Sequence, residues 1–147
     1  MAVPLGGRVP AVVDLTEAEL RAWGEALGRA LVAPAFLTLA GDLGAGKTTL
    51  AAAILRGAGV REAVTSPTYA VVQRYTTTTG VPVHHADLYR LRGPQELAAI
   101  GWEELLESPG IVLVEWPERA GGLLPADRRD IAVAHLPGDA ARRRLTA

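Results

Sequence analysis

The order of apolar and glycine-rich segments predicts an α/β fold, in which a mostly parallel sheet lies between two layers of helices as a three-layer sandwich. An apolar run at 35–40 leads directly into a glycine-rich stretch, which is followed by helix-forming residues at 48–56. A second apolar run, at 110–117, is continuous enough for a strand that is buried on both faces. Between these runs, residues 70–89 contain two strand-like segments joined by a short polar connection, which predicts one antiparallel hairpin.

Length and composition are those of one globular domain, which we expect to span residues 1–147. Apolar residues make up 49% of the chain and charged residues 21%, a balance typical of soluble folded proteins. No apolar run approaches the roughly 20 residues of a membrane helix, and the N-terminus lacks the pattern of a secretory signal. The chain has no cysteine, which excludes disulfides, thiol catalysis and cysteine-bound metals. We therefore expect a cytoplasmic protein.

The first helix is predicted by its cap and by its apolar stripe. Thr16 is followed three residues later by Glu19, the spacing of a capping box. Apolar residues then recur at helical spacing from Leu20 to Leu31, and Pro34 ends the pattern. The remaining elements are predicted as a strand at 35–40, a helix at 48–56 ended by glycines within 57–59, a loop at 65–69, strands at 70–75 and 83–89, short helices within 93–108, and strands at 110–117 and 129–136.

A local run of positive charge lies near the C-terminus, where Arg142, Arg143 and Arg144 are adjacent. The chain as a whole has a formal net charge of −1 and therefore no general attraction to nucleic acid, whose binding depends on many phosphate contacts. Charge runs of this kind most often form a solvent-exposed chain end. A contact with phosphate or with a partner protein is the alternative.

The glycine-rich stretch from Gly41 to Thr48 matches the phosphate-binding pattern G-x-x-x-x-G-K-[ST]. Its glycines allow backbone N–H groups to surround a phosphate, and the following helix contributes its positive N-terminal end. Lys47 is the only lysine in the chain, and a compact ammonium suits this narrow space better than a planar guanidinium. The pattern predicts that Lys47 binds the β- and γ-phosphates and that Thr48 binds Mg²⁺.

A phosphate-binding loop also requires a carboxylate at the end of a neighbouring buried strand, where it helps to hold the metal. Glu115 closes the second apolar run and is the best candidate for this role. A further group should contact the γ-phosphate or activate water. Asp87, Thr65, Ser66 and Thr68 are the candidates, because they lie in polar segments next to predicted loops.

Histidine and tryptophan side chains near these strands have less specific predicted roles. His84 and His85 are adjacent in a predicted strand and therefore point to opposite faces, so they cannot both bind one metal. We expect each of them at the surface or at the rim of the core. Trp102 and Trp116 fit either the core or a contact with nucleotide or partner, and for Trp116 the position beside Glu115 favours the contact.

The nucleotide class follows from a missing residue type. The chain contains no asparagine, so the guanine-reading motif N-K-x-D of regulatory GTPases is impossible and ATP is the better hypothesis. A small-molecule kinase is an alternative, in which residues 118–129 would form an arginine-bearing lid. We expect such an enzyme to need a longer chain for its substrate pocket and lid.

Several motifs occur in the order and at the spacing of one known family. They are GDLGAGKTTL, SPTY, HADLYRL, ELAAIGWEELL and VLVEWPERAGGLLP, and the match runs from about Thr16 to Pro125. Together they resemble the TsaE family, with DLYRL and EWPER far more discriminating than the phosphate-binding loop alone. The family resembled is a bacterial ATPase that works with TsaB and TsaD to install threonylcarbamoyl on adenosine 37 of tRNAs that read ANN codons.

The resemblance also implies roles for single residues. Lys47, Asp87 and Glu115 would be the catalytic group, with Asp87 either orienting water or supporting the metal. Thr48 and Glu115 would hold Mg²⁺, and Thr68 would lie in a switch-like loop near the γ-phosphate. The implied nucleotide-binding residues are Thr16, Glu17, Leu43, Gly44, Ala45, Gly46, Lys47, Thr48, Thr49, Thr68 and Trp116, of which Thr16 and Glu17 would approach the adenine.

On this basis we expect slow Mg²⁺-dependent ATP hydrolysis that partner proteins control. Hydrolysis would release an ordered switch loop and reset the TsaB–TsaD complex between turnovers, with tRNA contacted only indirectly. Two alternatives belong to other classes: the small-molecule kinase, and a nucleotide-dependent binding module whose ATPase activity is incidental.

Overall fold

The protein was analysed as a computed structural model, which describes residues 11–64 and 71–147; Thr65, Ser66 and Thr68 lie outside these ranges. The strands are β1 (Val12–Thr16), β2 (Ala35–Ala40), β3 (Val72–Thr76), β4 (Pro82–Asp87), β5 (Ile111–Glu115), β6 (Arg129–Leu136) and β7 (Asp139–Thr146). The helices are α1 (Glu17–Ala30), α2 (Lys47–Ala58) and α3 (Trp102–Leu106), with 3₁₀ helices η1 (Pro94–Ile100) and η2 (Pro117–Leu123). One seven-stranded sheet has the order β1-β7-β6-β2-β5-β4-β3.

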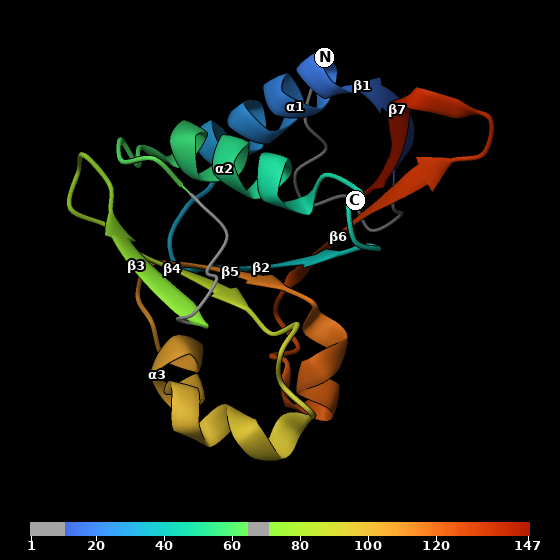
Figure 1. Ribbon diagram of the computed structural model, residues 1–147. Helices are drawn as coiled ribbons and strands as arrows, with labels where there is room; N and C mark the ends of the chain where they lie inside the picture. The colour runs from blue at the N-terminus through green and yellow to red at the C-terminus, as the bar shows by residue number, and fades with distance from the viewer. Residues whose placement is uncertain (1–10, 65–70) are drawn as a thin grey trace.

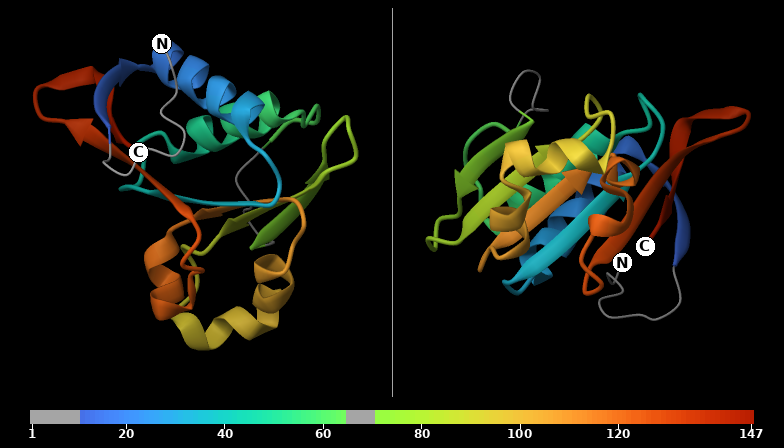
Figure 2. Two further views of the ribbon diagram at one scale, coloured as in Figure 1. Left: turned by 180° about the vertical axis from the view of Figure 1, so that it is seen from behind. Right: turned by 90° about the horizontal axis from the view of Figure 1, so that it is seen from below.

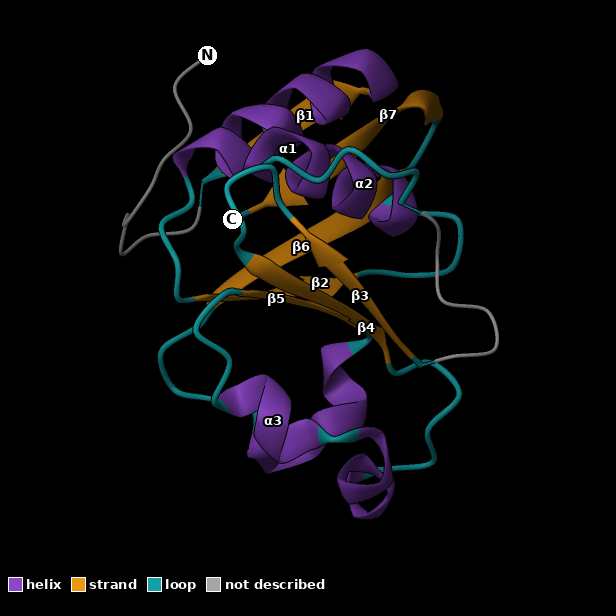
Figure 3. Cartoon of the chain, turned by 90° about the vertical axis from the view of Figure 1, so that its left-hand side faces the viewer, coloured by secondary structure: helices purple, strands orange, loops and turns teal. Residues whose placement is uncertain are grey.

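The sheet lies between two helical layers, as the sequence predicted. Figure 1 shows α1 and α2 on one face and the shorter helical segments, including α3, on the other. The side view in Figure 3 shows the same helix–sheet–helix order. The three-layer α/β architecture is therefore confirmed.

The centre of the sheet consists of β4, β5, β2 and β6, which are all parallel to one another. Their carboxyl ends meet at one edge, which is where open α/β sheets bind ligands. The predicted hairpin is also present, because β3 and β4 pair antiparallel. The view from below in Figure 2 shows these strands side by side. The parallel centre thus brings the ends of four predicted strands to one edge of the sheet.

The arginine run does not form a free chain end, which the sequence favoured, but lies in an additional strand. β7 pairs antiparallel with β6 on one side and with β1 on the other, so this margin of the sheet is antiparallel. Arg144 forms an ion pair of 2.9 Å with Asp14 across the two strands, and Arg142 forms one of 2.7 Å with Asp139. Leu145 is buried in the core. Carboxylates thus pair with Arg142 and Arg144, and the buried Leu145 anchors the strand that carries the run.

The helix α1 begins at the predicted capping box. Glu19 donates its backbone N–H to Thr16 Oγ1, and the backbone N–H of Thr16 donates to Glu19 Oε1. Along its length α1 lies very close to α2. A Cβ on Gly28 would lie 2.0 Å from the carbonyl oxygen of Ile54, so only glycine permits this approach. The close packing holds α2, and with it the glycine-rich loop, firmly over the sheet.

Apolar clusters fill the space on both sides of the sheet. Leu113 of β5 belongs to the cluster under α1 and α2, whereas its neighbours Val112 and Val114 belong to the cluster over the shorter helices. Since side chains alternate along a strand, Glu115 shares the α1–α2 side with Leu113. No helix in the part of the chain that the structure describes is long and apolar enough to cross a membrane.

Candidate functional site

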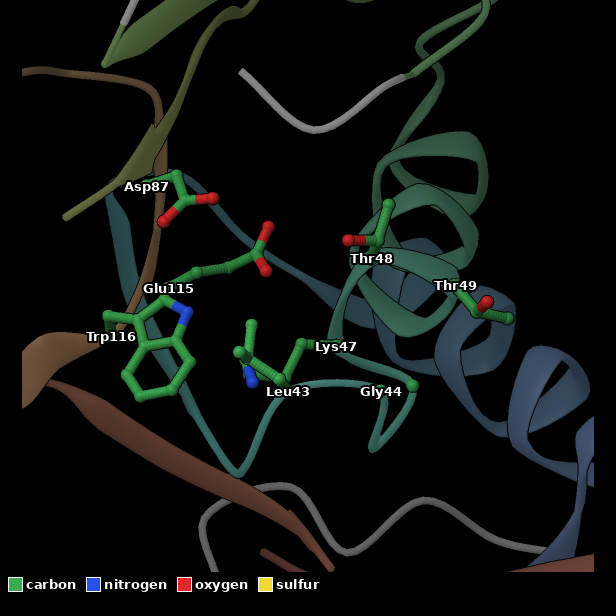
Figure 4. A pocket seen from close by; sticks show the side chains of 9 residues that line it. Leu43, Gly44, Lys47, Thr48, Thr49, Asp87, Glu115 and Trp116 are labelled. Atoms are coloured by element: carbon green, nitrogen blue, oxygen red, sulfur yellow. The ribbon is translucent and has the colours of Figure 1, made fainter. Parts of the chain in front are cut away.

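A pocket lies at the carboxyl ends of β2, β4 and β5, next to the start of α2. The loop after β2 forms one wall of it, and the ends of β4 and β5 form another (Figure 4). The pocket is lined by Leu43, Gly44, Gly46, Lys47, Thr48, Thr49, Asp87, Glu115 and Trp116. The structure therefore brings together residues that are widely separated in the sequence and that were predicted to act together.

The glycine-rich loop joins the end of β2 directly to the start of α2. Gly46 precedes the helix with a φ of 105°, a left-handed conformation that favours glycine. At the other end, a Cβ on Gly41 would lie 2.3 Å from the carbonyl oxygen of Val133, so β6 presses against the loop. These two glycines set the path of the loop, and Lys47, Thr48 and Thr49 of the first turn of α2 line the pocket.

Lys47 lies in the pocket with its ammonium held by its own loop. Nζ donates a hydrogen bond of 2.7 Å to the carbonyl oxygen of Asp42 and a second one to that of Gly41. It also lies 4.3 Å from the ring centroid of Trp116, a cation–π distance. Burial lowers the pKa of Lys47, while nearby carboxylates, that of Glu115 first, act in the opposite direction. The partners of Nζ are acceptors that phosphate oxygens can replace.

Two carboxylates face the lysine and threonine from neighbouring strands. Asp87 and Glu115 are the last residues of β4 and β5 and are paired in register. Figure 4 shows both side chains pointing into the pocket toward Thr48. Burial raises the pKa of Asp87 and the charge of Glu115 adds to this, although a hydrogen bond of 3.0 Å from the Tyr89 backbone N–H opposes the shift. The pocket thus contains a carboxylate that burial makes more basic than usual.

His85 contacts the site directly, which the sequence reasoning missed. We expected a histidine at the surface or the rim of the core, but His85 is fully buried and its Nε2 lies 2.6 Å from Oε2 of Glu115. The expectation was wrong for this residue because a polar partner across the strand makes burial possible. A signal was present in the sequence: His85 and Asp87 are two residues apart on one strand and therefore share a face.

Trp116 turns the chain back toward the pocket immediately after β5. Its φ of 57° is the only positive φ of a non-glycine residue in the described ranges, and such a conformation is uncommon outside glycine. Its ring packs against that of Tyr89, with 4.8 Å between the ring centroids. The left-handed turn therefore places an aromatic wall beside Lys47 at the end of β5.

The oxygen groups of the pocket fit Mg²⁺. Thr48 contributes a hydroxyl, and Asp87 and Glu115 contribute carboxylates. Among the described residues, no group of three or more His, Cys, Asp or Glu side chains could hold a metal alone. Mg²⁺ suits such a site because it is usually bound through one or two protein oxygens together with substrate phosphates and water.

Some residues of the predicted set lie away from the pocket lining. Thr16 caps α1, and Glu17 forms an exposed ion pair of 2.8 Å with Arg21. The Ala45 side chain is buried in the core, and its backbone N–H donates to the carbonyl oxygen of Asp42. Thr68 lies outside the described residues. Contacts of Thr16 and Glu17 with adenine stay a prediction.

Comparison with known proteins assigns this combination of fold and loop to a family. The profile of "Threonylcarbamoyl adenosine biosynthesis protein TsaE" matches residues 15–145. The chain belongs to the TsaE family. Proteins named tRNA threonylcarbamoyladenosine biosynthesis protein TsaE are 46% identical to it over 87 residues in Haemophilus influenzae and 37% identical over 124 residues in Streptomyces coelicolor. The resemblance found in the sequence motifs is thereby confirmed.

The extent of the matches differs between relatives. The alignments cover 59% of this chain for the Haemophilus protein and 83% for the Streptomyces protein. They span 54% of the Haemophilus relative, 60% of one from Nostoc and 83% of the Streptomyces relative. The crystal structure of YdiB from Bacillus subtilis is similar over 95% of this chain and 86% of that chain, with a TM-score of 0.73 and 29% identity. The TsaE fold thus extends over nearly all of the chain.

Proposed function

We propose that this TsaE protein is a Mg²⁺-dependent ATPase that supports threonylcarbamoylation of adenosine 37 in tRNAs reading ANN codons. The observation that carries the proposal is the meeting of Lys47 and Thr48, from the loop and α2, with Asp87 and Glu115 in one pocket. A triphosphate site needs the first two, and hydrolysis needs the carboxylates as well.

Binding of ATP would use groups that already face the pocket. The N–H groups at the start of α2 and the ammonium of Lys47 would hold the phosphates, with Lys47 leaving the carbonyl oxygens of its own loop. Thr48 and Glu115 would hold Mg²⁺, which neutralises charge on the phosphate oxygens. Trp116, next to Lys47, would form the wall beside the nucleotide.

Asp87 is suited to act on the attacking water. Its raised pKa makes it a better proton acceptor than an ordinary aspartate, and it lies opposite Glu115 at the end of β4. In this role it orients the water whose oxygen bonds to the γ-phosphorus while the bond from that phosphorus to the bridging oxygen breaks. The products are ADP and inorganic phosphate, and no phosphate acceptor other than water is needed.

The kinase alternative has less support. Its lid would be residues 118–129, yet η2 at the start of this segment is bound to α3 and to the loop between β4 and η1. Trp102 Nε1 donates to the Leu123 carbonyl oxygen at 3.0 Å, and Arg119 donates to that of Leu91 at 3.1 Å. ATP labelled at the γ-phosphate distinguishes the two activities, because a hydrolase releases all of the label as inorganic phosphate.

The cellular role proposed is to reset a TsaB–TsaD complex in the cytoplasm between turnovers, with tRNA contacted only indirectly. The names of the relatives place them in tRNA threonylcarbamoyladenosine biosynthesis. The net charge of −1 suits a protein partner better than direct binding of tRNA, and most arginines of the run at the C-terminal margin are engaged in ion pairs.

Reconstitution tests this role. Purified TsaB and TsaD should carry out multiple rounds of threonylcarbamoylation when this protein is present and stop after about one round when it is absent. The Lys47→Met variant serves as the matched control and should behave like the absent protein. Equal yields with and without the protein would overturn the proposed function, and full support by Lys47→Met would favour a binding module with incidental ATPase activity.

A further inference from the structure

We propose that His85 is a positioning residue for the magnesium carboxylate, Glu115. This inference rests on the proposed function, since His85 would orient the carboxylate that holds Mg²⁺ in the proposed site. Its geometric basis is the 2.6 Å contact between His85 Nε2 and Glu115 Oε2. Because a carboxylate only accepts hydrogen bonds, the imidazole donates from Nε2.

The bond joins two side chains that are removed from solvent. His85 has no exposed surface and Glu115 retains 2%. A buried carboxylate without a donor loses its hydration and gains nothing in return, so its rotamer is held strongly by any donor that it meets. The bond engages one carboxylate oxygen and leaves the second oxygen for the pocket, which Glu115 also lines.

The strand geometry explains why the donor reaches this carboxylate. In the parallel pair β4–β5, Asp87 lies opposite Glu115 and His85 lies opposite Leu113. His85, Asp87 and Glu115 therefore share the face of the sheet that carries the glycine-rich loop. Glu115 has the imidazole donor on one side and a second carboxylate, Asp87, across the strand. The hydrogen bond from His85 opposes the repulsion between the carboxylates of Asp87 and Glu115, which would otherwise turn Glu115 away from the pocket.

Among the residues that the structure describes, Glu115 is the hydrogen-bond partner of the His85 ring. Nδ1 is buried and has no hydrogen-bond partner among the residues that the structure describes. An unpaired buried nitrogen costs stability, and an apolar side chain of similar size would avoid that cost. The single polar contact of the ring, through Nε2, is directed at Glu115. Groups that hold a metal ligand in this way commonly change metal affinity by about 10- to 100-fold when removed.

Two substitutions separate the donor from the volume of the ring. His85→Gln keeps an N–H donor at nearly the reach of Nε2, and His85→Met fills a similar space without a donor. His84→Gln is the matched control, because His84 precedes His85 on the same strand and points to the other face. Folding is checked for every variant by thermal denaturation, where His85→Met should stay folded but lose some stability, because Glu115 is left without its donor.

The measurement is calorimetric binding of the slowly hydrolysed analogue ATPγS, at graded Mg²⁺ concentrations and with EDTA. We expect His85→Met to need about 10-fold more Mg²⁺ for half-maximal enhancement of binding, while affinity in EDTA changes less than about 2-fold. His85→Gln should return to within about 3-fold of the parent, and His84→Gln should match the parent. Equal Mg²⁺ requirements in His85→Met and the parent overturn the inference, as does an equal loss of affinity with and without metal.

The test also separates this inference from the proposed function. A parent protein whose ATPγS binding ignores Mg²⁺ has no magnesium site, which overturns both. If His85→Met does not fold, His85→Asn takes its place, because its amide is one bond too short to reach Oε2 while its polarity matches that of glutamine. His85→Asn should then lose Mg²⁺ affinity where His85→Gln keeps it, and equal affinities of these two variants overturn the role of the bond.

Discussion

The charged groups at the centre of the sheet and those at its antiparallel margin are arranged in opposite ways. At the margin, Asp14 receives two hydrogen bonds from Arg144, of 2.9 and 3.2 Å, and both side chains are partly exposed. At the centre, no ion pair within the described ranges joins Lys47 to Asp87 or Glu115, although all three line one pocket. The margin uses its charges to hold strands together, whereas the centre keeps charges available for a ligand.

Two aspartates show the energetic side of this difference. The hydrogen bond from Arg144 lowers the pKa of Asp14, whereas burial raises the pKa of Asp87. The ionised form is thus favoured by folding at the margin and disfavoured at the centre. Buried charged groups that lower the stability of the nucleotide-free protein are the ones expected to contribute to nucleotide binding and hydrolysis.

The largest expected effect on nucleotide binding is its loss in Lys47→Met. The substitution keeps most of the side-chain volume and removes the only ammonium in the pocket, whose charged hydrogen bonds to phosphate contribute about 1.5–3 kcal/mol. We expect affinity for Mg²⁺–ATPγS to fall by about 10- to 100-fold, measured by calorimetry. Arg144→Gln, which removes a charge at the margin, should bind as the parent does; equal losses in the two variants would contradict the comparison.

The second effect is on hydrolysis, in Asp87→Asn. The amide cannot accept a proton, so we expect the rate of ATP hydrolysis to fall by about 100-fold or more. Affinity for ATPγS should change only a few-fold, because the role assigned to Asp87 is toward water. Release of inorganic phosphate and calorimetric binding are measured on the same preparation. Collapse of binding would show instead that Asp87 is structural.

The same variant should be more stable than the parent at neutral pH. Because the pKa of Asp87 is raised by folding, the folded state favours the protonated form, and its contribution to stability is lost as pH rises through the folded pKa. Asp87→Asn removes this loss of stability, and the side-chain oxygen of the amide can still accept the hydrogen bond from the Tyr89 backbone N–H. We expect a gain below about 1 kcal/mol at pH 7, since Asp87 is only half-buried and solvent screens it.

Chemical denaturation of the nucleotide-free protein in EDTA, repeated at falling pH, measures this gain. The difference between Asp87→Asn and the parent should shrink as pH falls through the folded pKa of Asp87 toward the ordinary value of 3.8, where the parent is protonated as well. A difference that does not depend on pH would assign the gain to packing rather than to charge.

The smallest effect is expected at the margin, in Asp14→Asn. The pKa of Asp14 is lowered by Arg144, so the stabilisation is present above the ordinary value of 3.8 and is lost as pH falls through the folded pKa. Asp14→Asn should therefore be slightly less stable than the parent at pH 7 and equally stable at strongly acid pH, by thermal denaturation. ATPγS affinity should stay the same, and a changed affinity would link the margin to the site.

Most of the architecture could be predicted from local patterns. The capping box of α1, the loop between β2 and α2 and the apolar run of β5 each carry their signal within a few neighbouring residues. The margin could not be predicted in this way. β7 pairs with β1, where Asp14, more than a hundred residues earlier in the chain, meets Arg144, and no local rule contains that pairing.

The sequence by itself determined the family and predicted a phosphate ligand, because the phosphate-binding pattern and the motifs around Asp87 and Glu115 are read from residue type and spacing. Only the tertiary structure decided how these groups meet. The register of β4 against β5 sets Asp87 opposite Glu115, and the same register brings the buried His85 within 2.6 Å of that glutamate. Hydrogen bonds between strands depend on strand order and register, which the folded chain sets through long-range contacts that residue type and spacing do not contain.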